Sequence, residues 1–247
     1  MSLKVTLLGT GVGIPQPGRS QSSILVENGS ASPIIFDCGA GTLLRLAEAG
    51  INIDDLDSVV LTHLHLDHSA DVLALANARY LLGFPGLNVY GPSGTEKWLQ
   101  AQLSSFPYLE KMEVYANEMK PMDSVSLKGC DIFAEEAKHS VNALAYRMDC
   151  GDKAIVYSGD TEPSPRVVAL AEGADLLIHE CSFPEPFDVT NHTTPRKLGR
   201  LLKNIGRVVL THLYPQAQGH EDEMAADVEL ISGLPVEVGY DMQIIAL

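Results

Sequence analysis

Short apolar runs alternate along the chain with segments whose apolar residues recur at helical spacing, and turn-forming residues separate them. Runs of the first kind are typical of buried strands, and segments of the second kind are typical of helices that bury one face. In the first part of the chain these patterns predict strands at residues 3–9, 22–27, 33–37, 58–61 and 87–90, and helices at residues 42–49, 71–82 and 96–105. Such an alternation indicates a layered α/β protein.

The pattern changes after residue 114, where short alternating runs with turns continue to residue 156 and predict the strands of a second sheet. The same criteria then predict strands at residues 154–157, 175–179, 207–210, 236–238 and 242–246, and helices at residues 163–172, 195–204 and 222–231. Thr194 and Pro195 suit the N-cap and the first position of the middle helix. The sequence contains no internal repeat and no low-complexity linker. Layered α/β proteins of this length are commonly single units, so we expect residues 1–247 to form one domain.

Four side chains of the kinds that bind metals follow the strand at residues 58–61: His63, His65, Asp67 and His68. His63 and His65 lie two residues apart, so in an extended segment they share one face and can bind one ion. Asp67 and His68 come after the chain has begun to turn, and can therefore reach a second ion. In the alternative interpretation the histidines only satisfy one another in a polar loop. Four ligand-type residues in this order argue against it.

Other polar residues stand directly after predicted strands. Asp160 follows the strand at residues 154–157, His212 follows the strand at residues 207–210, and His139 lies between two strands of the second sheet. Asp37 has two interpretations: it orients a metal site, or it caps the helix at residues 42–49. The glycine-rich turn at residues 9–13 resembles a dinucleotide-binding loop, but Pro15 and Pro17 follow where the required helix would begin, which excludes that function.

The formal net charge of the chain is −15, from 32 acidic and 17 basic residues, and no large cluster of basic residues occurs. This balance argues against a large polyanion as the substrate. No apolar segment is long enough to span a membrane, and the chain enters a strand at once, so we expect a cytoplasmic protein. The four cysteines are widely spaced, which predicts buried free thiols at positions 38, 130, 150 and 181.

The order of these side chains, HxHxDH, then a single histidine, then an aspartate after Ser-Gly and a histidine after Leu-Thr, resembles the ligand order of the metallo-β-lactamase superfamily over essentially the whole chain. Within it the sequence is most similar to the ribonuclease Z branch. That similarity rests on residues 8–11 with Pro15 and Arg19, on residues 158–161, on His179 and Glu180, and on residues 191–194. The resemblance implies a four-layer αββα sandwich and a metal-dependent hydrolase.

The resemblance also implies roles for individual residues. His63, His65 and His139 would hold one ion, Asp67, His68 and His212 would hold the other, and Asp160 would bridge the two. Nitrogen and oxygen ligands suit zinc, with manganese or iron as alternatives. Asp67 would also accept the proton of the attacking water, and His192 would protonate the leaving alkoxide or hold its charge.

Five further residues are candidates for supporting the metal site or for contacting the substrate. These residues are Asp37, His179, Glu180, Arg19 and Tyr214. For His179 the alternative is a packed residue at a strand end, and for Tyr214 it is a surface tyrosine. Arg19 is a candidate for contacting a substrate phosphate. His220 is expected to be solvated.

The sequence departs from the ribonuclease Z pattern in two places. Only twenty residues separate His139 from Asp160, so the long arm that grips tRNA is absent, and the segment His212-Leu213-Tyr214-Pro215 lacks the family's serine and arginine. We therefore expect a phosphodiesterase that acts on a small or cyclic phosphodiester. The cysteine-rich zinc site of some armless relatives is also missing.

Three alternatives stay open. One is an RNA 3′-processing endoribonuclease of the ribonuclease Z type, with the grip supplied by a partner subunit. Another is a carboxylic-ester or lactone hydrolase, against which His192 argues because a protonated leaving group suits phosphodiesters better. The last is a non-catalytic binding protein on a hydrolase fold, against which the complete ligand set argues. The resemblance also implies a homodimer.

Overall fold

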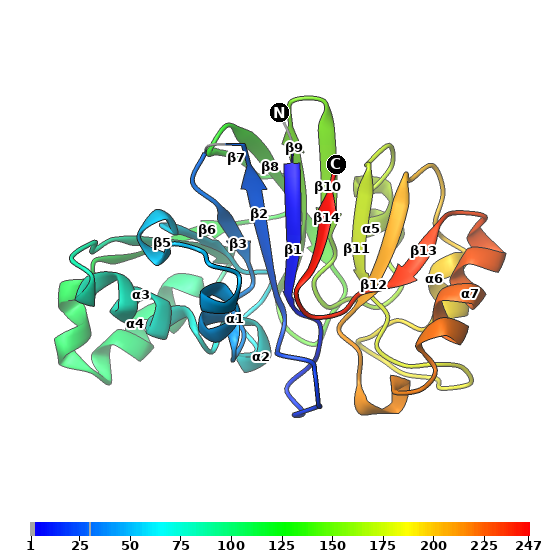
Figure 1. The fold of residues 1–247 in the computed structure, drawn as a ribbon, viewed down its shortest axis with the longest axis horizontal. Helices are drawn as coiled ribbons and strands as arrows, with labels where there is room; N and C mark the ends of the chain where they lie inside the picture. The colour runs from blue at the N-terminus through cyan, green and yellow to red at the C-terminus, as the bar shows by residue number, and fades with distance from the viewer. Residues whose placement is uncertain (1–2, 30) are drawn as a thin grey trace.

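Two β-sheets face each other in the middle of the molecule, and helices cover the outer side of each (Figure 1). The computed structural model describes residues 3–29 and 31–247; residues 1 and 2, which precede the first predicted strand, and residue 30 lie outside this description. This arrangement confirms the predicted four-layer αββα sandwich.

The first sheet has the strand order β14-β1-β2-β3-β4-β5-β6. Its strands are β1 (Leu3–Gly9), β2 (Ser23–Asn28), β3 (Ile34–Phe36), β4 (Ser58–Val60), β5 (Leu87–Pro92), β6 (Val114–Met119) and β14 (Gln243–Ala246). The pairs from β3 to β6 are parallel, and β14 runs antiparallel to β1.

The second sheet has the order β13-β12-β11-β10-β9-β8-β7. Its strands are β7 (Ser124–Leu127), β8 (Cys130–Ala137), β9 (Ala143–Cys150), β10 (Lys153–Tyr157), β11 (Leu176–Glu180), β12 (Arg207–Thr211) and β13 (Val236–Val238). Strands β10 to β13 are parallel, so the chain leaves β10, β11 and β12 at the same edge of the sheet.

Alternation along the strands divides their apolar residues between the inner core and the outer cores. In β1, Leu3, Val5 and Leu7 point into the core between the sheets, and Leu8 packs in the outer core of the first sheet. In β11, Leu176 and Ile178 point inward, and Leu177 packs in the outer core of the second sheet.

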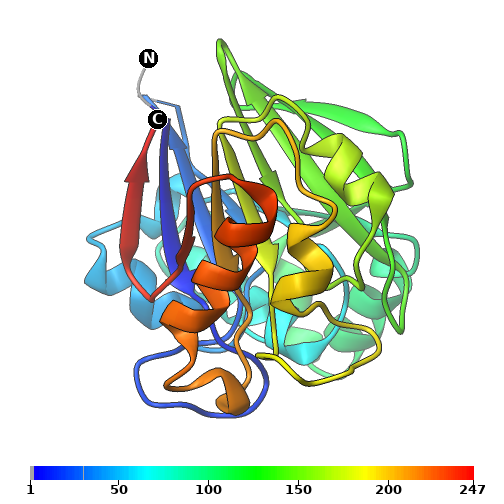
Figure 2. The same ribbon diagram turned by 90° about the vertical axis from the view of Figure 1, so that its right-hand side faces the viewer.

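Helices complete the two outer layers. Beside the first sheet lie α1 (Thr42–Glu48), α2 (Leu66–Ser69), α3 (Val72–Leu81) and α4 (Thr95–Ser104), with the short 3-10 helices η1 (Ile53–Asp55) and η2 (Pro107–Met112). Over the second sheet lie α5 (Pro165–Leu170), α6 (Pro195–Gly199) and α7 (Glu221–Ser232), preceded by η3 (Pro215–Ala217). Figure 2 shows α6 and α7 side by side on this face. Among the described residues, no helix combines the length and the apolar character that crossing a membrane requires.

The structure corrects three predictions. Strand β6, expected in the second sheet, pairs with β5 at the edge of the first. Helix α6 ends at Gly199 rather than near residue 204. Cys130 and Cys150 form a disulfide, because strands β8 and β9 pair Asp131 with Asp149 and so bring the two cysteines opposite each other. Cys38 and Cys181 are buried free thiols, as predicted.

Candidate metal centre

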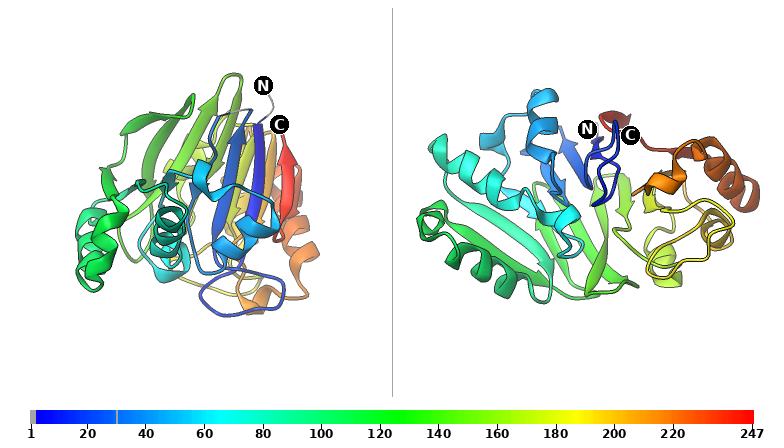
Figure 3. Two further views of the ribbon diagram at one scale, coloured as in Figure 1. Left: turned by 60° about the vertical axis from the view of Figure 1, so that its left-hand side comes forward. Right: turned by 90° about the horizontal axis from the view of Figure 1, so that it is seen from below.

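The predicted metal ligands converge at one end of the sandwich, the lower end in Figure 1. His63 and His65 lie between β4 and α2, Asp67 and His68 lie in α2, His139 lies in the turn between β8 and β9, and Asp160 and His212 follow β10 and β12. Seen from below (Figure 3, right), the loops at this end lie between the two helical layers. Both sheets therefore contribute to a single cluster.

Backbone contacts between the sheets fix the first histidine segment. The Tyr146 hydroxyl donates to the Leu61 carbonyl at 2.9 Å, and the Leu144 amide donates to the Thr62 carbonyl at 2.9 Å. Gly159, at φ +55°, passes so close to Thr62 that a Cβ there would lie 2.6 Å from the Thr62 Cβ. This approach explains why glycine precedes Asp160.

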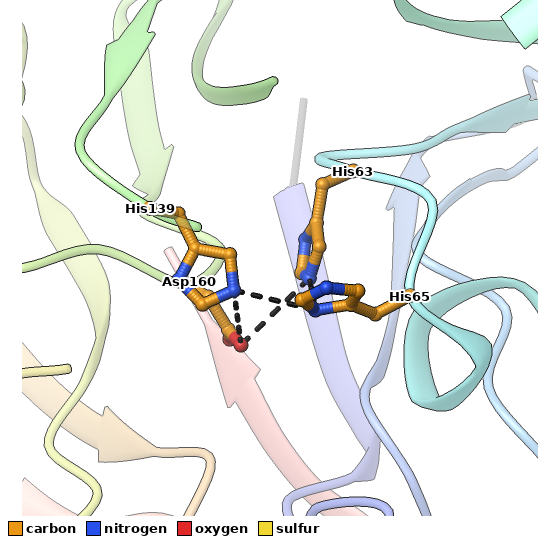
Figure 4. A group of neighbouring side chains, drawn as sticks. All are labelled: His63, His65, His139 and Asp160. Atoms are coloured by element: carbon orange, nitrogen blue, oxygen red, sulfur yellow. Dashed lines mark hydrogen bonds and ion pairs between the residues drawn. The ribbon is translucent and has the colours of Figure 1, made fainter. Parts of the chain in front are cut away.

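His63, His65, His139 and Asp160 form the first group (Figure 4). Nε2 of His63 and Nε2 of His139 lie 3.0 and 3.3 Å from Nδ1 of His65. The Asp160 Oδ2 lies 3.8 Å from Nε2 of His63 and 3.7 Å from Nε2 of His139. Three imidazole nitrogens and one carboxylate oxygen thus face a common point.

Asp67, His68 and His212 form the second group, with the other oxygen of Asp160 beside them. The Asp160 Oδ1 lies 3.3 Å from Nε2 of His68 and 3.2 Å from Nε2 of His212. The Asp67 Oδ2 lies 3.5 Å from Nε2 of His212. Asp160 Oδ1, His68 Nε2 and His212 Nε2 are buried and have no hydrogen-bond partner. Buried polar atoms without a partner are costly, so their convergence fits a bound cation.

Hydrogen bonds on the far side of each ring orient the lone pairs toward the cluster. Nδ1 of His139 donates to the Asn191 carbonyl at 2.9 Å. The Thr62 hydroxyl donates to Asp37, which leaves Nδ1 of His63 as the donor to that hydroxyl. Each Nε2 is then left unprotonated, which is the tautomer that such hydrogen-bond partners select for histidines in metal sites.

Hydrogen bonds to Nδ1 orient the histidines of the second group in the same way. Nδ1 of His68 lies 2.6 Å from the Asp37 carboxylate, and Nδ1 of His212 lies 3.1 Å from the Ser182 hydroxyl. Asp37 therefore does not cap α1, because its carboxylate accepts from Thr62, His68 and Tyr157. The capping interpretation of Asp37 is wrong, and Asp71 accepts the Gly41 and Leu43 amides at the start of that helix instead.

Charge in the cluster is arranged to attract a cation. Burial opposes ionisation of Asp160, but the surrounding histidines outweigh it and hold the pKa of Asp160 well below its usual range. Burial lowers the pKa of His63 and of His139. Burial also opposes protonation of His68, but Asp160 and Asp37 outweigh it and raise its pKa. The carboxylates that stabilise a proton on His68 would equally stabilise a metal ion.

His192 lies at the edge of the cluster. Its Nδ1 is 3.1 Å from the Glu180 Oε1, and its Nε2 is 3.3 Å from the Tyr214 hydroxyl. Burial lowers the pKa of His192, but the Glu180 carboxylate outweighs burial and raises it. One nitrogen of His192 can also group with Asp160 and His212 as a ligand set.

Glu180 is fully buried and saturated with hydrogen bonds. It accepts from the backbone amides of Thr161, Ser182 and Thr193, and from the Ser182 hydroxyl. The carboxylate therefore ties the Asp160 turn to the His192 segment.

Two candidates lie away from the cluster. His179 alternates with Glu180 along β11, so it shares the outer face with Leu177; its Nδ1 contacts only the Glu180 carbonyl. The packed interpretation of His179 is the one that the geometry favours. The Arg19 guanidinium donates to the Thr10 hydroxyl and the Gly239 carbonyl, and it lies 3.7 Å from Glu221. His220, 50% exposed, pairs with Glu223 on the surface.

Sequence reasoning missed Thr62, Ser182 and Phe183. Thr62 and Ser182 position histidines of the cluster, and each stands two residues beyond a strand end, which is the signal that could have identified them. The Phe183 ring stacks on Tyr214 at 4.4 Å. No sequence spacing indicates that contact, because the two rings follow different strands.

A two-sheet sandwich with two groups of histidine and aspartate side chains at one end, drawn from both sheets, defines a metallo-β-lactamase-like hydrolase fold. The chain belongs to the beta-lactamase superfamily domain family, whose sequence model matches residues 33–213. It lies in the ribonuclease Z-like branch. The ribonuclease Z of Mycobacterium sp. (strain KMS) is 29% identical, over 97% of this chain and 94% of that protein. The ribonuclease Z of Methanosarcina acetivorans is 27% identical, over 85% of this chain and 87% of that protein.

Among solved structures, the metallo-beta-lactamase fold protein YhfI from Bacillus subtilis superposes with a TM-score of 0.87 at 26% identity and covers 100% of both chains. Between His139 and Asp160 the chain contains only β9, β10 and their turns. The structure therefore confirms that no tRNA-gripping arm is inserted there.

Proposed function

We propose that the protein is a binuclear metal-dependent phosphodiesterase that acts on a small or cyclic phosphodiester. His63, His65, His139 and Asp160 would hold one divalent cation, and Asp67, His68, His212 and Asp160 the other; zinc suits these nitrogen and oxygen donors. When bound, the two ions supply a water of lowered pKa and stabilise negative charge on the phosphoryl oxygens.

Asp67 is suited to accept the proton of the attacking water. Burial opposes ionisation of Asp67, but His212 and His68 outweigh it and hold its pKa below the usual range, so the carboxylate is ionised at neutral pH. The Gly13 amide donates to its Oδ2 at 2.9 Å and fixes its orientation.

The observation that carries the proposal is the position of His192. Glu180 anchors its Nδ1, one of its nitrogens groups with Asp160 and His212, and the Glu180 carboxylate raises its pKa, which favours the protonated ring. As the water oxygen bonds to phosphorus and the bond to the leaving oxygen breaks, Nε2 would give its proton to the leaving alkoxide. A positioned histidine suits this task because its pKa lies near the working pH.

Three features support a small substrate: the arm is absent, the chain carries a net charge of −15, and a cavity adjoins the cluster. The cavity has a volume of about 450 Å³ and is lined by His139, Ser140, Asn142, Lys120 and Lys138, among others. This volume is in the range of small-molecule sites.

A second candidate function is RNA 3′-end processing. The curated ribonuclease Z relatives align over nearly the whole chain, which favours it. The missing arm and the net charge of −15 argue against folded RNA as the substrate, unless a partner subunit binds the RNA.

One experiment separates these functions. Metal analysis of freshly purified protein should find close to two transition-metal ions per chain, and a finding of none would refute the binuclear site. The metal-loaded protein is then incubated in parallel with bis(p-nitrophenyl) phosphate, cyclic nucleotides, a lactone and a pre-tRNA. Hydrolysis of the small diesters supports the proposal, preferential cleavage of pre-tRNA supports the second candidate, and preference for the lactone contradicts both.

A further inference from the structure

Three aromatic side chains form a continuous surface next to the metal centre, which we call the aromatic strip: Phe183, Phe187 and Tyr214. The rings of Phe183 and Tyr214 are stacked, with centroids 4.4 Å apart and an angle of 28° between their planes. Phe187 lies 5.6 Å from Phe183. The Tyr214 amide donates to the Ser182 carbonyl at 3.1 Å, and this bond brings the two stacked rings together.

The strip lies on the His192 side of the cluster. The Tyr214 ring is 5.2 Å from the His192 ring, and the Phe183 ring is 6.2 Å from it. In the proposed reaction His192 protonates the leaving group, so the part of the substrate bonded to the leaving oxygen must lie beside these rings.

The strip lies outside the hydrophobic cores, and its rings are half-buried or exposed. Among the described residues, none of its three members belongs to the hydrophobic cores of the sandwich, and Phe187 is 43% exposed. Apolar rings that are exposed next to a polar catalytic cluster are a feature of ligand sites.

Polar contacts hold the segment that carries the strip. The Glu185 carboxylate accepts the Arg196 amide at 3.0 Å, and Lys197 pairs with Asp188 at 2.7 Å, so the segment is tied to α6. At its far end the Asn191 amide donates to Glu162. The rings are thereby held before a ligand arrives, which reduces the cost of binding.

We infer that the aromatic strip stacks on a nucleobase in the leaving group, so that the substrate is a phosphodiester of a nucleoside. This inference rests on the proposed function, which places the leaving group of the substrate beside the strip. Every base has a flat π-face, and stacking on one aromatic side chain strengthens binding by roughly tenfold. The Tyr214 hydroxyl lies 3.3 Å from Nε2 of His192, so Tyr214 connects the strip to the group that would protonate the leaving oxygen.

The test compares ligands that differ only in the base. Binding of adenosine 5′-monophosphate and of ribose 5-phosphate to the zinc-loaded protein is measured by calorimetry. We expect the nucleotide to bind roughly tenfold more tightly. Phe183→Leu should abolish this preference, and Phe187→Ala should reduce it. Neither variant should change the affinity for ribose 5-phosphate. Tyr108→Leu, at an exposed ring in η2, is the matched control and should keep the preference.

Equal affinity of the wild-type protein for both ligands would overturn the inference, as would a preference that survives in both strip variants. Circular dichroism and metal content establish that each variant is folded. A parallel assay uses a dinucleoside monophosphate and the same diester with an abasic leaving sugar. If neither diester is cleaved but the calorimetric preference holds, the proposed function fails and the strip remains a base-binding surface.

Discussion

The Asp37 carboxylate lies 2.6 Å from Nδ1 of His68, and both side chains are fully buried. The contact fixes the proton of His68 on Nδ1 and turns its Nε2 toward Asp160. Asp37 adopts a φ of 55° directly after β3, a conformation that residues other than glycine rarely adopt. Packing from both sheets holds this carboxylate in place, because it also accepts from Thr62 and Tyr157.

Replacing this carboxylate should weaken metal binding. We expect Asp37→Ala to lower metal affinity by roughly 10–100-fold, as loss of an outer-shell partner does, because the His68 ring loses its fixed tautomer. Affinity is measured by competition with a chromophoric chelator. Asp71→Ala is the control, since that carboxylate accepts helix amides and contacts no histidine. Unchanged affinity in Asp37→Ala would show that His68 is oriented without it.

Removing the proposed acid should leave the metals in place. We expect His192→Ala to retain its metal ions and to lose turnover by roughly 10²–10⁴-fold on a diester with an alkoxide leaving group. The loss should be much smaller for p-nitrophenolate, which departs without a proton. His220→Ala, at an exposed histidine, serves as the control. An equal loss for both leaving groups would exclude an acid role for His192.

An ion pair joins the two sheets at Asp57. The Lys128 ammonium lies 2.7 Å from its carboxylate, and Ser58 donates to it as well. Burial raises the pKa of Asp57, but these two hydrogen bonds outweigh burial and lower it below its usual value of 3.8. A lowered pKa contributes stability above the unfolded-state pKa, and this contribution is lost as the pH falls through the folded-state pKa.

Asp57→Asn should therefore be less stable than the wild type by about 0.5 kcal/mol at pH 7, since the pair is partly exposed and screened. The difference should be the same at pH 5 and should shrink below about pH 4. Urea unfolding of metal-free protein at these pH values measures it. Asp152→Asn, in the exposed turn between β9 and β10, should show no such dependence. A difference that grows at low pH would contradict the sign of this contribution.

Counting the reactive thiols of the chain tests the disulfide. Without reductant, the denatured chain should show two reactive thiols, Cys38 and Cys181, and after reduction it should show four. The Cys130→Ser, Cys150→Ser double variant should lose about 3 kcal/mol of stability, because the bond closes a loop of 20 residues. Four thiols in the unreduced chain would contradict the bond.

The sequence alone predicted most strands and the positions that meet at the metal centre, because strand ends and ligand spacing are local signals. Asp37 could not be resolved in this way: a carboxylate after a strand can cap a helix or bind a histidine, and only the packing of His68 and Tyr157 decides which occurs. The role of Arg19 likewise depends on contacts with Gly239, far away in the sequence.

The remaining errors arise from long-range pairing. Strand β6 alternates like its successors, and only its parallel pairing with β5 places it in the first sheet. Helix α6 stops where Gly199 packs against Ile231 and Val228 of α7. The disulfide depends on the register of β8 and β9, which cysteine spacing does not reveal.

The ligand groups draw on both sheets, with His63, His65, Asp67 and His68 on one side and His139, Asp160 and His212 on the other. Ions bound there would connect chain segments that lie far apart in the sequence, much as a covalent cross-link does. Metal loading would then restrain how the two halves of the sandwich slide or separate. Assembly of the catalytic centre and closure of the fold would be one thermodynamic event.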